Sequence, residues 1–268
     1  MSDLVTLDGV SVRYGNRAAL ADITLALPRG ARLAVIGESG SGKSTLAYCI
    51  TGLLPAGAIR SGRVGFAMPL RLGADIGVLF QDPTSSLNPV LPIGEQIAEV
   101  LVVHRGATWS AAEAEAIRLL DRMRIPDAAN RIGHYAHQFS GGQCQRIALA
   151  AAIAAGPALL IADEPTSALD SVVQAELVRL LDTLVREDGL TLLFITHDIA
   201  LAAQLADRVA VLNDGHLIEQ GALTNVLANP AHPYTRALIA TTLDIAGPPR
   251  RRLPEIDPVD FAVLHRDD

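Results

Sequence analysis

The chain has 268 residues and a formal net charge of −7; half of its residues are hydrophobic, whereas only 4% are aromatic. This hydrophobic content excludes a disordered protein, and the acidic balance argues against a nucleic-acid partner. The longest apolar run, residues 147–162, contains Gly156-Pro157 and is shorter than the roughly 18 to 20 residues of a membrane-spanning helix. The acidic start Met1-Ser2-Asp3, followed by a strand-like pattern, predicts that the chain has no signal peptide. We therefore expect a globular core with an inserted subdomain and no membrane helix.

The two cysteines, Cys49 and Cys144, lie far apart and lack the spacing of a metal site. Both fall in apolar helical patterns, which predicts buried free thiols, no zinc and no iron–sulfur cluster. Such thiols fit a reducing cytosol. The basic cluster Arg250 to Arg252 is flanked by prolines, and we interpret it as a solvated tail.

The first part of the chain has the pattern of an α/β core. Two alternating segments can pair as antiparallel strands. A short apolar strand, a glycine-rich loop and a helix follow, in the order that opens such a core. The strands are predicted at residues 4–14, 20–27, 33–36 and 76–80, the loop at 37–42 and the helix at 43–53.

Helical spacing then marks residues 88–155 as an inserted helical subdomain. Its helices are predicted at 93–103 and from Ser110, where Ser110-x-x-Glu113 has the pattern of a capping box. Strands and helices alternate again afterwards, which predicts a largely parallel sheet with helices on both faces. The later strands are predicted at 158–162, 191–195, 208–212 and 216–220, the helices at 171–187, opened by Ser171-x-x-Gln174, and at 199–205.

A phosphate-binding motif stands between the predicted strand 33–36 and the helix that follows it. Residues 37–44 match G-x-x-x-x-G-K-[ST]. Glycines let the backbone point several N–H groups at one phosphate chain, and the helix N-terminus adds its positive dipole end. Lys43 supplies a charge to the β- and γ-phosphates, and the Ser44 hydroxyl can ligate Mg²⁺. The alternative is an ordinary Gly/Ser turn. The predicted nucleotide-binding residues here are Gly37, Glu38, Ser39, Gly40, Ser41, Gly42, Lys43, Ser44 and Thr45.

An acidic pair, Asp163-Glu164, follows the apolar run Leu159 to Ala162. The carboxyl end of such a strand is where α/β sheets place their ligands. Asp163 is predicted to hold Mg²⁺ through water, and Glu164 to orient or deprotonate an attacking water. On its own such a pair is usually a loop; the glycine loop upstream favours the functional interpretation.

A second anion-binding helix start is predicted at Ser140-Gly141-Gly142-Gln143, which follows Phe139 and precedes the helical stretch 144–155. One chain does not need two such sites for one nucleotide. A pair of chains, each presenting this helix end to the other's γ-phosphate, would use both.

The order of these motifs resembles the ABC (ATP-binding cassette) ATPase family over roughly residues 4–240. The resemblance implies ATP as substrate, Mg²⁺ as cofactor, a P-loop core with an inserted helical subdomain, and catalysis by Glu164, His197 and Lys43. Phe139 stands where the family more usually has Leu. By the same resemblance Tyr14 stacks on adenine, Gln81 senses Mg²⁺ and His197 contacts the γ-phosphate. Asp170 ends the loop that crosses the dimer interface. The signature motif is formed by Ser140, Gly141, Gly142 and Gln143.

Three of these residues have plainer alternatives. Tyr14 could end a strand and pack in the core, Gln81 could be a turn residue before Pro83, and His197 could cap the following helix with Asp198. Every motif of the hydrolytic site is intact, so we expect a site that is competent for ATP hydrolysis.

Residues 80–89 and 229–238 resemble the dipeptide, oligopeptide and nickel importers of bacteria, and residues 251–256 resemble the start of that group's C-terminal extension. For 229–238 the plainer alternative is a C-terminal helix preceded by turn-forming prolines. Many relatives continue into a cysteine cluster that this chain lacks, and peptide or metal-chelate cargo stays open. The predicted division is a core of 1–87 and 156–228, a helical subdomain of 88–155 and a truncated extension of 229–268.

The same resemblance implies a second ATPase subunit, either a paralogue or another copy, two transmembrane permease subunits and an extracytoplasmic solute-binding protein. The chain would then lie at the cytoplasmic face of the membrane as a peripheral subunit. The alternatives are an exporter ATPase, a soluble ABC ATPase acting on ribosomes or DNA, and a P-loop kinase. A single cassette without coiled-coil or zinc insertions weighs against the second, and the Ser-Gly-Gly-Gln segment weighs against the third.

Overall fold

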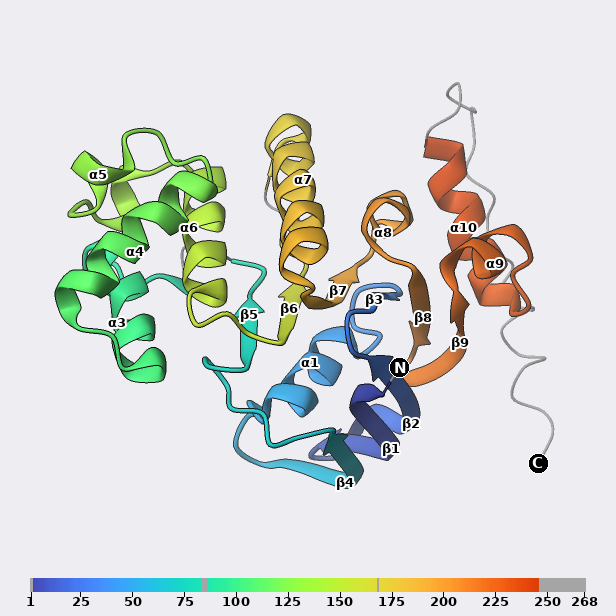
Figure 1. Ribbon diagram of the computed structural model, residues 1–268. Coiled ribbons are helices and arrows are strands. Elements are labelled where there is room, and N and C mark those ends of the chain that lie inside the picture. Colours follow the sequence, from blue (N-terminus) through green and yellow to red (C-terminus); the bar gives the residue numbers. More distant parts are fainter. Residues whose placement is uncertain (1, 83–85, 168, 246–268) are drawn as a thin grey trace.

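The computed structural model describes residues 2–82, 86–167 and 169–245 of the chain (Figure 1). Of the predicted features, residues 83–85, Ala168 and the tail from 246 to 268 lie outside these ranges. The strands are β1 (Asp3–Tyr14), β2 (Arg17–Pro28), β3 (Arg32–Ile36), β4 (Ala58–Phe66), β5 (Ile76–Leu79), β6 (Leu159–Asp163), β7 (Thr191–Thr196), β8 (Arg208–Asn213) and β9 (His216–Ala222).

These strands form two sheets. The smaller sheet is antiparallel, with the order β2-β1-β4, and the larger has the order β5-β6-β7-β3-β8-β9. Neighbours from β5 to β8 are parallel, and β9 pairs with β8 in antiparallel fashion. The predicted α/β class with a largely parallel sheet is confirmed. Strand β4 was missed, because most of its residues are exposed and its sequence has no apolar alternation.

Alternate residues of β6 face the two sides of the larger sheet. Leu160 and Ala162 pack into a cluster with the helices on one side. Leu159 and Ile161 pack into a second cluster with β1, β2 and helix α1 (Lys43–Thr51). Every residue of β6 and β7 is buried, which explains the apolar runs Leu159–Ala162 and Leu192–Ile195 within them. The smaller sheet and α1 therefore cover one face, and helices from other parts of the chain cover the other.

Between β5 and β6 the chain forms a group of helices at one end of the molecule (Figure 1). This insertion is the predicted helical subdomain, whose limits of 88 and 155 stay a prediction. Its elements are α3 (Ile93–Arg105), α4 (Trp109–Arg122), α5 (Ala128–Arg131), the 3₁₀ turn η1 (Ala136–Gln138) and α6 (Gly141–Ile153).

Two predicted helix caps are wrong, although the predicted start of a helix at Ser171 is confirmed. Helix α4 is capped by Thr108, whose hydroxyl accepts from the Ala111 amide at 3.3 Å, so Ser110 lies inside the first turn. Helix α7 (Ser171–Asp188) is capped by Asp170, whose carboxylate accepts from the amides of Val172 and Val173 at 3.0 Å. In both cases an extended residue just upstream already supplies the side-chain oxygen that a cap requires.

The remaining helices are α8 (Ile199–Leu205), α9 (Leu223–Ala228) and α10 (Pro233–Ile245). Tyr234 and Leu238 of α10 pack against a cluster formed by β3, β8, α8 and α9. In the part of the chain that the structure describes, no helix combines the length and apolar character needed to cross a bilayer.

The packing of β5 against α6 yields a prediction about stability. A Cβ on Gly77 would lie 2.2 Å from the Ala152 carbonyl oxygen, so strand and helix would have to move apart. Gly77→Ala should destabilise the protein by about 1–3 kcal/mol, measured by urea unfolding. Gly133→Ala is the matched control, since a Cβ there meets nothing within 4 Å. Equal stability of the two variants would contradict the packing.

Candidate nucleotide-binding site

The loop from Gly37 to Gly42 joins β3 to α1 at the carboxyl end of the larger sheet, and close packing makes two of its glycines necessary. A Cβ on Gly37 would lie 2.2 Å from the Leu212 carbonyl oxygen, and one on Gly42 would lie 2.5 Å from the Ala19 carbonyl oxygen. Gly42 also has φ 103°, which only glycine adopts readily. The predicted strand, loop and helix are therefore present, and the loop is pressed against β8 and β2.

Lys43 is buried at the base of this loop. Its Nζ donates to the carbonyl oxygens of Gly37 at 2.9 Å and of Glu38 at 2.8 Å. Burial lowers the pKa of Lys43, whereas the nearby carboxylates of Glu164 and Asp163 act to raise it. The ammonium group is thus held inside the loop, where a phosphate chain could replace the two carbonyl oxygens.

Glu164 connects Lys43 with His197. Its Oε1 lies 3.8 Å from Lys43 Nζ and its Oε2 lies 3.3 Å from His197 Nδ1. The residue has φ 44°, an unusual conformation for a non-glycine residue that is often found at functional sites. Its amide donates to the Ile195 carbonyl at 2.9 Å, which fixes the carboxylate at the edge of the sheet.

Asp163, the last residue of β6, is buried, and its Oδ1 has no hydrogen-bond partner among the described residues. Burial raises its pKa, and a hydrogen bond with Ser44 opposes this rise. A buried carboxylate oxygen without a partner next to a serine hydroxyl is the oxygen-rich environment that Mg²⁺ prefers. The residues therefore fit the predicted magnesium ion.

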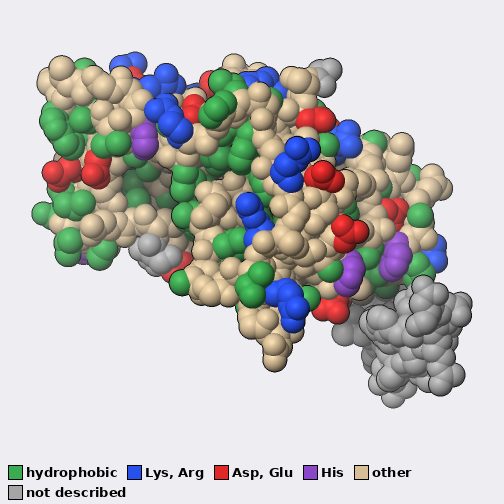
Figure 2. Space-filling view, turned by 90° about the horizontal axis from the view of Figure 1, so that it is seen from below, with side chains coloured by type: hydrophobic (Ala, Val, Ile, Leu, Met, Phe, Trp, Pro, Cys, Tyr) green, Lys and Arg blue, Asp and Glu red, His purple; other side chains and the backbone are tan. Residues whose placement is uncertain are grey.

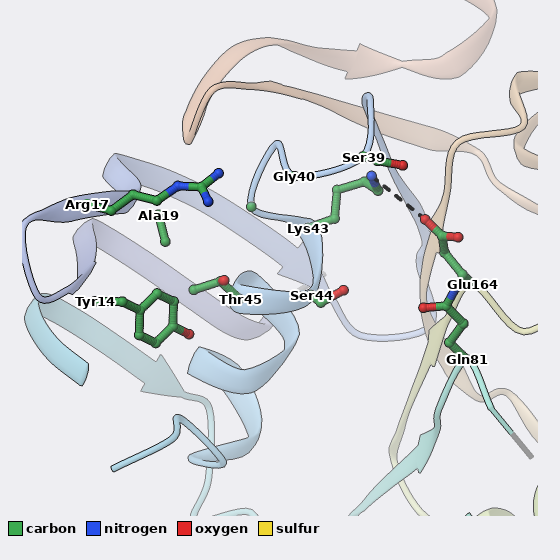
Figure 3. A pocket seen from close by; sticks show the side chains of 11 residues that line it. Tyr14, Arg17, Ala19, Ser39, Gly40, Lys43, Ser44, Thr45, Gln81 and Glu164 are labelled. Carbon is green, nitrogen blue, oxygen red and sulfur yellow. Dashed lines mark ion pairs between the residues drawn. The ribbon is translucent and has the colours of Figure 1, made fainter. Parts of the chain in front are cut away.

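These elements surround a pocket of about 360 Å³ (Figure 3). Tyr14, which is half-buried, lies on one side of it beside Thr45, and Gln81 lies on the other side next to Glu164. The pocket is lined by Tyr14, Arg17, Ala19, Ser39, Gly40, Gly42, Lys43, Ser44, Thr45, Gln81 and Glu164. Arg17 and Ala19 were missed, because only the packing of β2 beside the loop brings them there.

A smaller cavity of about 150 Å³ lies on the other side of Glu164 and is lined in part by His197 and Asp198. Asp198, not His197, caps α8, because its carboxylate accepts from the amides of Ala200 and Leu201 at 2.8 and 3.1 Å. His197 is left exposed beside Glu164.

The segment 140–143 does not line either cavity. Ser140 caps α6: its Oγ accepts from the Gln143 amide at 3.3 Å, and Gln143 Oε1 accepts from the Ser140 amide at 3.1 Å. Ser140 and Gly141 are exposed, so this helix start is accessible to another molecule. Phe139 is buried under the Arg131 guanidinium, which lies 4.1 Å from the ring centroid. One chain therefore does not unite all the predicted site residues.

Comparisons with known proteins agree with this geometry. The family model described as ABC transporter matches residues 20–167, more than half of the chain. The chain is similar to the glutathione import ATP-binding protein GsiA of Salmonella paratyphi A (38% identity, 96% of this chain, 45% of that protein). It is also similar to GsiA of Escherichia coli O1:K1 (43% identity, 89% of this chain, 42% of that protein). The chain thus spans less than half the length of these relatives.

Among solved structures, the fold is similar to a dimeric ATP-binding cassette, MJ0796, in a post-hydrolysis state bound to ADP and Pi. The TM-score is 0.72 at 31% identity, and the match covers 82% of this chain and 99% of that chain. The family match, the fold and the glycine loop with its acidic partners agree. The chain belongs to the ABC transporter family.

Proposed function

We propose that the chain is the ATP-hydrolysing subunit of a bacterial ABC importer and works opposite a second cassette. The observation that carries the proposal is the pocket in which the glycine loop, Lys43, Gln81 and Glu164 converge. Such a pocket combines donors for a triphosphate with a carboxylate for a water molecule. The similarity to subunits named for glutathione import supports import as the process that hydrolysis drives.

Three side chains carry the proposed hydrolysis. Lys43 binds the β- and γ-phosphates, since its ammonium group is already held within the loop. Glu164 accepts the proton of the attacking water. His197 stabilises the γ-phosphate and orients Glu164, whose Oε2 it approaches to 3.3 Å.

Ser44, Asp163 and Gln81 would hold Mg²⁺. The buried, unpartnered Oδ1 of Asp163 is the feature that calls for a cation. The ion would supply positive charge that offsets the charge on the phosphate oxygens. The Ser44 hydroxyl is close enough to the Asp163 carboxyl to act against the rise in its pKa, so both oxygens are near the loop.

The exposed start of α6 would complete the site of a facing cassette. Ser140 presents a hydroxyl, and the first turn of α6 presents amides and a positive dipole end, the groups that bind anions. Asp170 would lie at the same interface beside the start of α7. Whether the facing cassette is a paralogue or a second copy of this chain depends on the transporter.

The helical end of the molecule provides a surface for the membrane subunits. Figure 2 shows hydrophobic side chains gathered over this end. Val90, Val103 and Trp109 are 75%, 65% and 53% exposed, and Trp109 borders a pocket of about 410 Å³. Exposed apolar groups around a hollow are typical of a protein interface, and we assign this one to two transmembrane permease subunits at the cytoplasmic face of the membrane.

The cargo would be a peptide or a nickel or other metal chelate delivered by an extracytoplasmic solute-binding protein. Glutathione, named for the relatives above, is itself a peptide, which favours peptides.

Co-purification and ATP turnover test this function. The tagged full-length chain should co-purify with two membrane subunits and a second cassette, and the complex should release phosphate from ATP only when Mg²⁺ is present. Co-purification with ribosomes or DNA, or the absence of phosphate release from the complete complex, would contradict it.

The adenine-stacking role of Tyr14 yields a separate prediction. Tyr14→Ala should weaken MgADP binding by about two- to tenfold through loss of ring stacking, whereas Tyr14→Trp should bind normally. Isothermal titration with MgADP measures both. Because Tyr14 also packs against the second core cluster, the thermal midpoint of each variant is the control. Unchanged affinity in Tyr14→Ala would assign the residue to the core alone.

A further inference from the structure

The segment from 229 to 238 is hydrogen-bonded to β9 through the carboxylate of Glu219. Glu219 accepts hydrogen bonds from the amides of Ala231 at 2.9 Å and His232 at 3.1 Å. Burial acts to raise the pKa of Glu219, but these hydrogen bonds hold it below its ordinary value, so the group is ionised at neutral pH. Arg236 closes the turn by donating to the carbonyl oxygens of Pro230 and Ala231 at 3.2 and 3.0 Å. The chain path into α10 is therefore well defined.

From this segment Tyr234 reaches the phosphate-binding loop. Its hydroxyl accepts a hydrogen bond of 3.0 Å from the amide of Glu38, 196 positions away in the sequence. The Tyr234 amide donates to His232 Nδ1 at 3.1 Å, and its ring packs against the cluster around β3 and β8. Burial raises the pKa of Tyr234, so the hydroxyl stays protonated at neutral pH.

Glu38 is thus held at both of its peptide groups. Tyr234 binds its amide, while its carbonyl oxygen accepts from Lys43 Nζ at 2.8 Å and from the Ser41 amide at 3.2 Å. The Glu38 residue itself is exposed. The first turn of the loop therefore owes part of its conformation to a residue of α10.

We propose that Tyr234 is a positioning residue of the nucleotide site, which holds the first turn of the loop ready for phosphate and thereby couples docking of residues 229–238 to nucleotide binding. The inference rests on the proposed binding of nucleotide to this loop. Coupling of two equilibria is reciprocal: if the docked segment favours nucleotide, bound nucleotide must favour docking of the segment. A residue that merely packed α10 against the core would show neither effect.

Removal of the Tyr234 hydroxyl alone separates these two roles. Tyr234→Phe keeps the ring and its packing but leaves the Glu38 amide without its acceptor. Loss of one such hydrogen bond should raise the Kd for MgADP about two- to tenfold. Because water can reach this exposed amide, the thermal midpoint of the nucleotide-free protein should fall by no more than about 2–4 °C. Thr241→Val is the matched control, because the Thr241 hydroxyl lies on the same helix and donates within it, to the Leu238 carbonyl at 2.9 Å.

Hydrogen exchange supplies the reciprocal measurement. In the wild-type full-length chain, MgADP should slow exchange of the amides between 231 and 240, and this protection should shrink in Tyr234→Phe but not in Thr241→Val. If the wild-type chain did not bind MgADP, the proposed function itself would be contradicted. Normal MgADP binding by wild type and Tyr234→Phe alike, with equal protection, would overturn the role of Tyr234 alone.

Discussion

Glu164→Gln should reduce the ATP turnover of the assembled transporter by about 100-fold or more, while ATP binding is retained. The amide keeps the size of the side chain but cannot accept the proton of the attacking water, and general-base catalysis contributes an effect of about this size. Since Lys43 and the glycine loop are unchanged, the variant should accumulate with ATP bound, paired with its partner cassette. Phosphate release and size-exclusion chromatography with MgATP measure the two effects.

Glu187→Gln is the matched control for this substitution. Glu187 lies on α7, is 63% exposed and pairs with Arg122 at 3.3 Å. A surface ion pair of this kind contributes little, so turnover should stay near the wild-type rate. If Glu164→Gln also hydrolysed ATP at the wild-type rate, Glu164 would not be the base.

Ser140→Arg should slow hydrolysis at the facing cassette by about 100-fold or more, because the bulky side chain would occupy the place of the facing γ-phosphate and remove a donor to it. The chain carrying the substitution should still bind MgADP with wild-type affinity, since Ser140 does not line its own pocket. Titration of the isolated chain and phosphate release from the complex measure these two properties separately.

The control for Ser140→Arg adds the same side chain elsewhere. Thr183 is exposed on α7, and its hydroxyl donates within that helix, to the Arg179 carbonyl at 2.8 Å. Thr183→Arg should leave both binding and turnover unchanged. Loss of nucleotide binding by the isolated Ser140→Arg chain would place Ser140 in its own site and contradict a shared one.

The elements that hold the site were largely predictable from the sequence. The glycine loop and the acidic pair each follow a short apolar strand, and parallel strands bring their carboxyl ends to one edge of the sheet. Lys43 and Glu164 therefore lie 3.8 Å apart, as expected for one site. Strands β6 and β7 were predictable because their residues are buried between apolar layers on both sides, which gives each strand a short apolar run.

The misses have different physical causes. Strand β4 pairs with β1 through its backbone, so its exposed side chains carry no signal. The caps of α4 and α7 were predicted at the wrong residues, because several neighbouring side chains can accept hydrogen bonds from the first helical amides. Arg17 and Tyr234 reach the loop only through tertiary packing, and no local pattern reports a contact over 196 positions.

The most direct test of a shared catalytic site is a structure of the Glu164→Gln protein, assembled with its partner cassette and bound to MgATP. We predict that each nucleotide lies between two chains, with Lys43 of one chain at its phosphates and the Ser140 end of α6 from the facing chain at its γ-phosphate. A nucleotide enclosed by one chain alone, with Ser140 remote from every phosphate, would contradict the shared catalytic site and with it the proposed role as a transporter subunit.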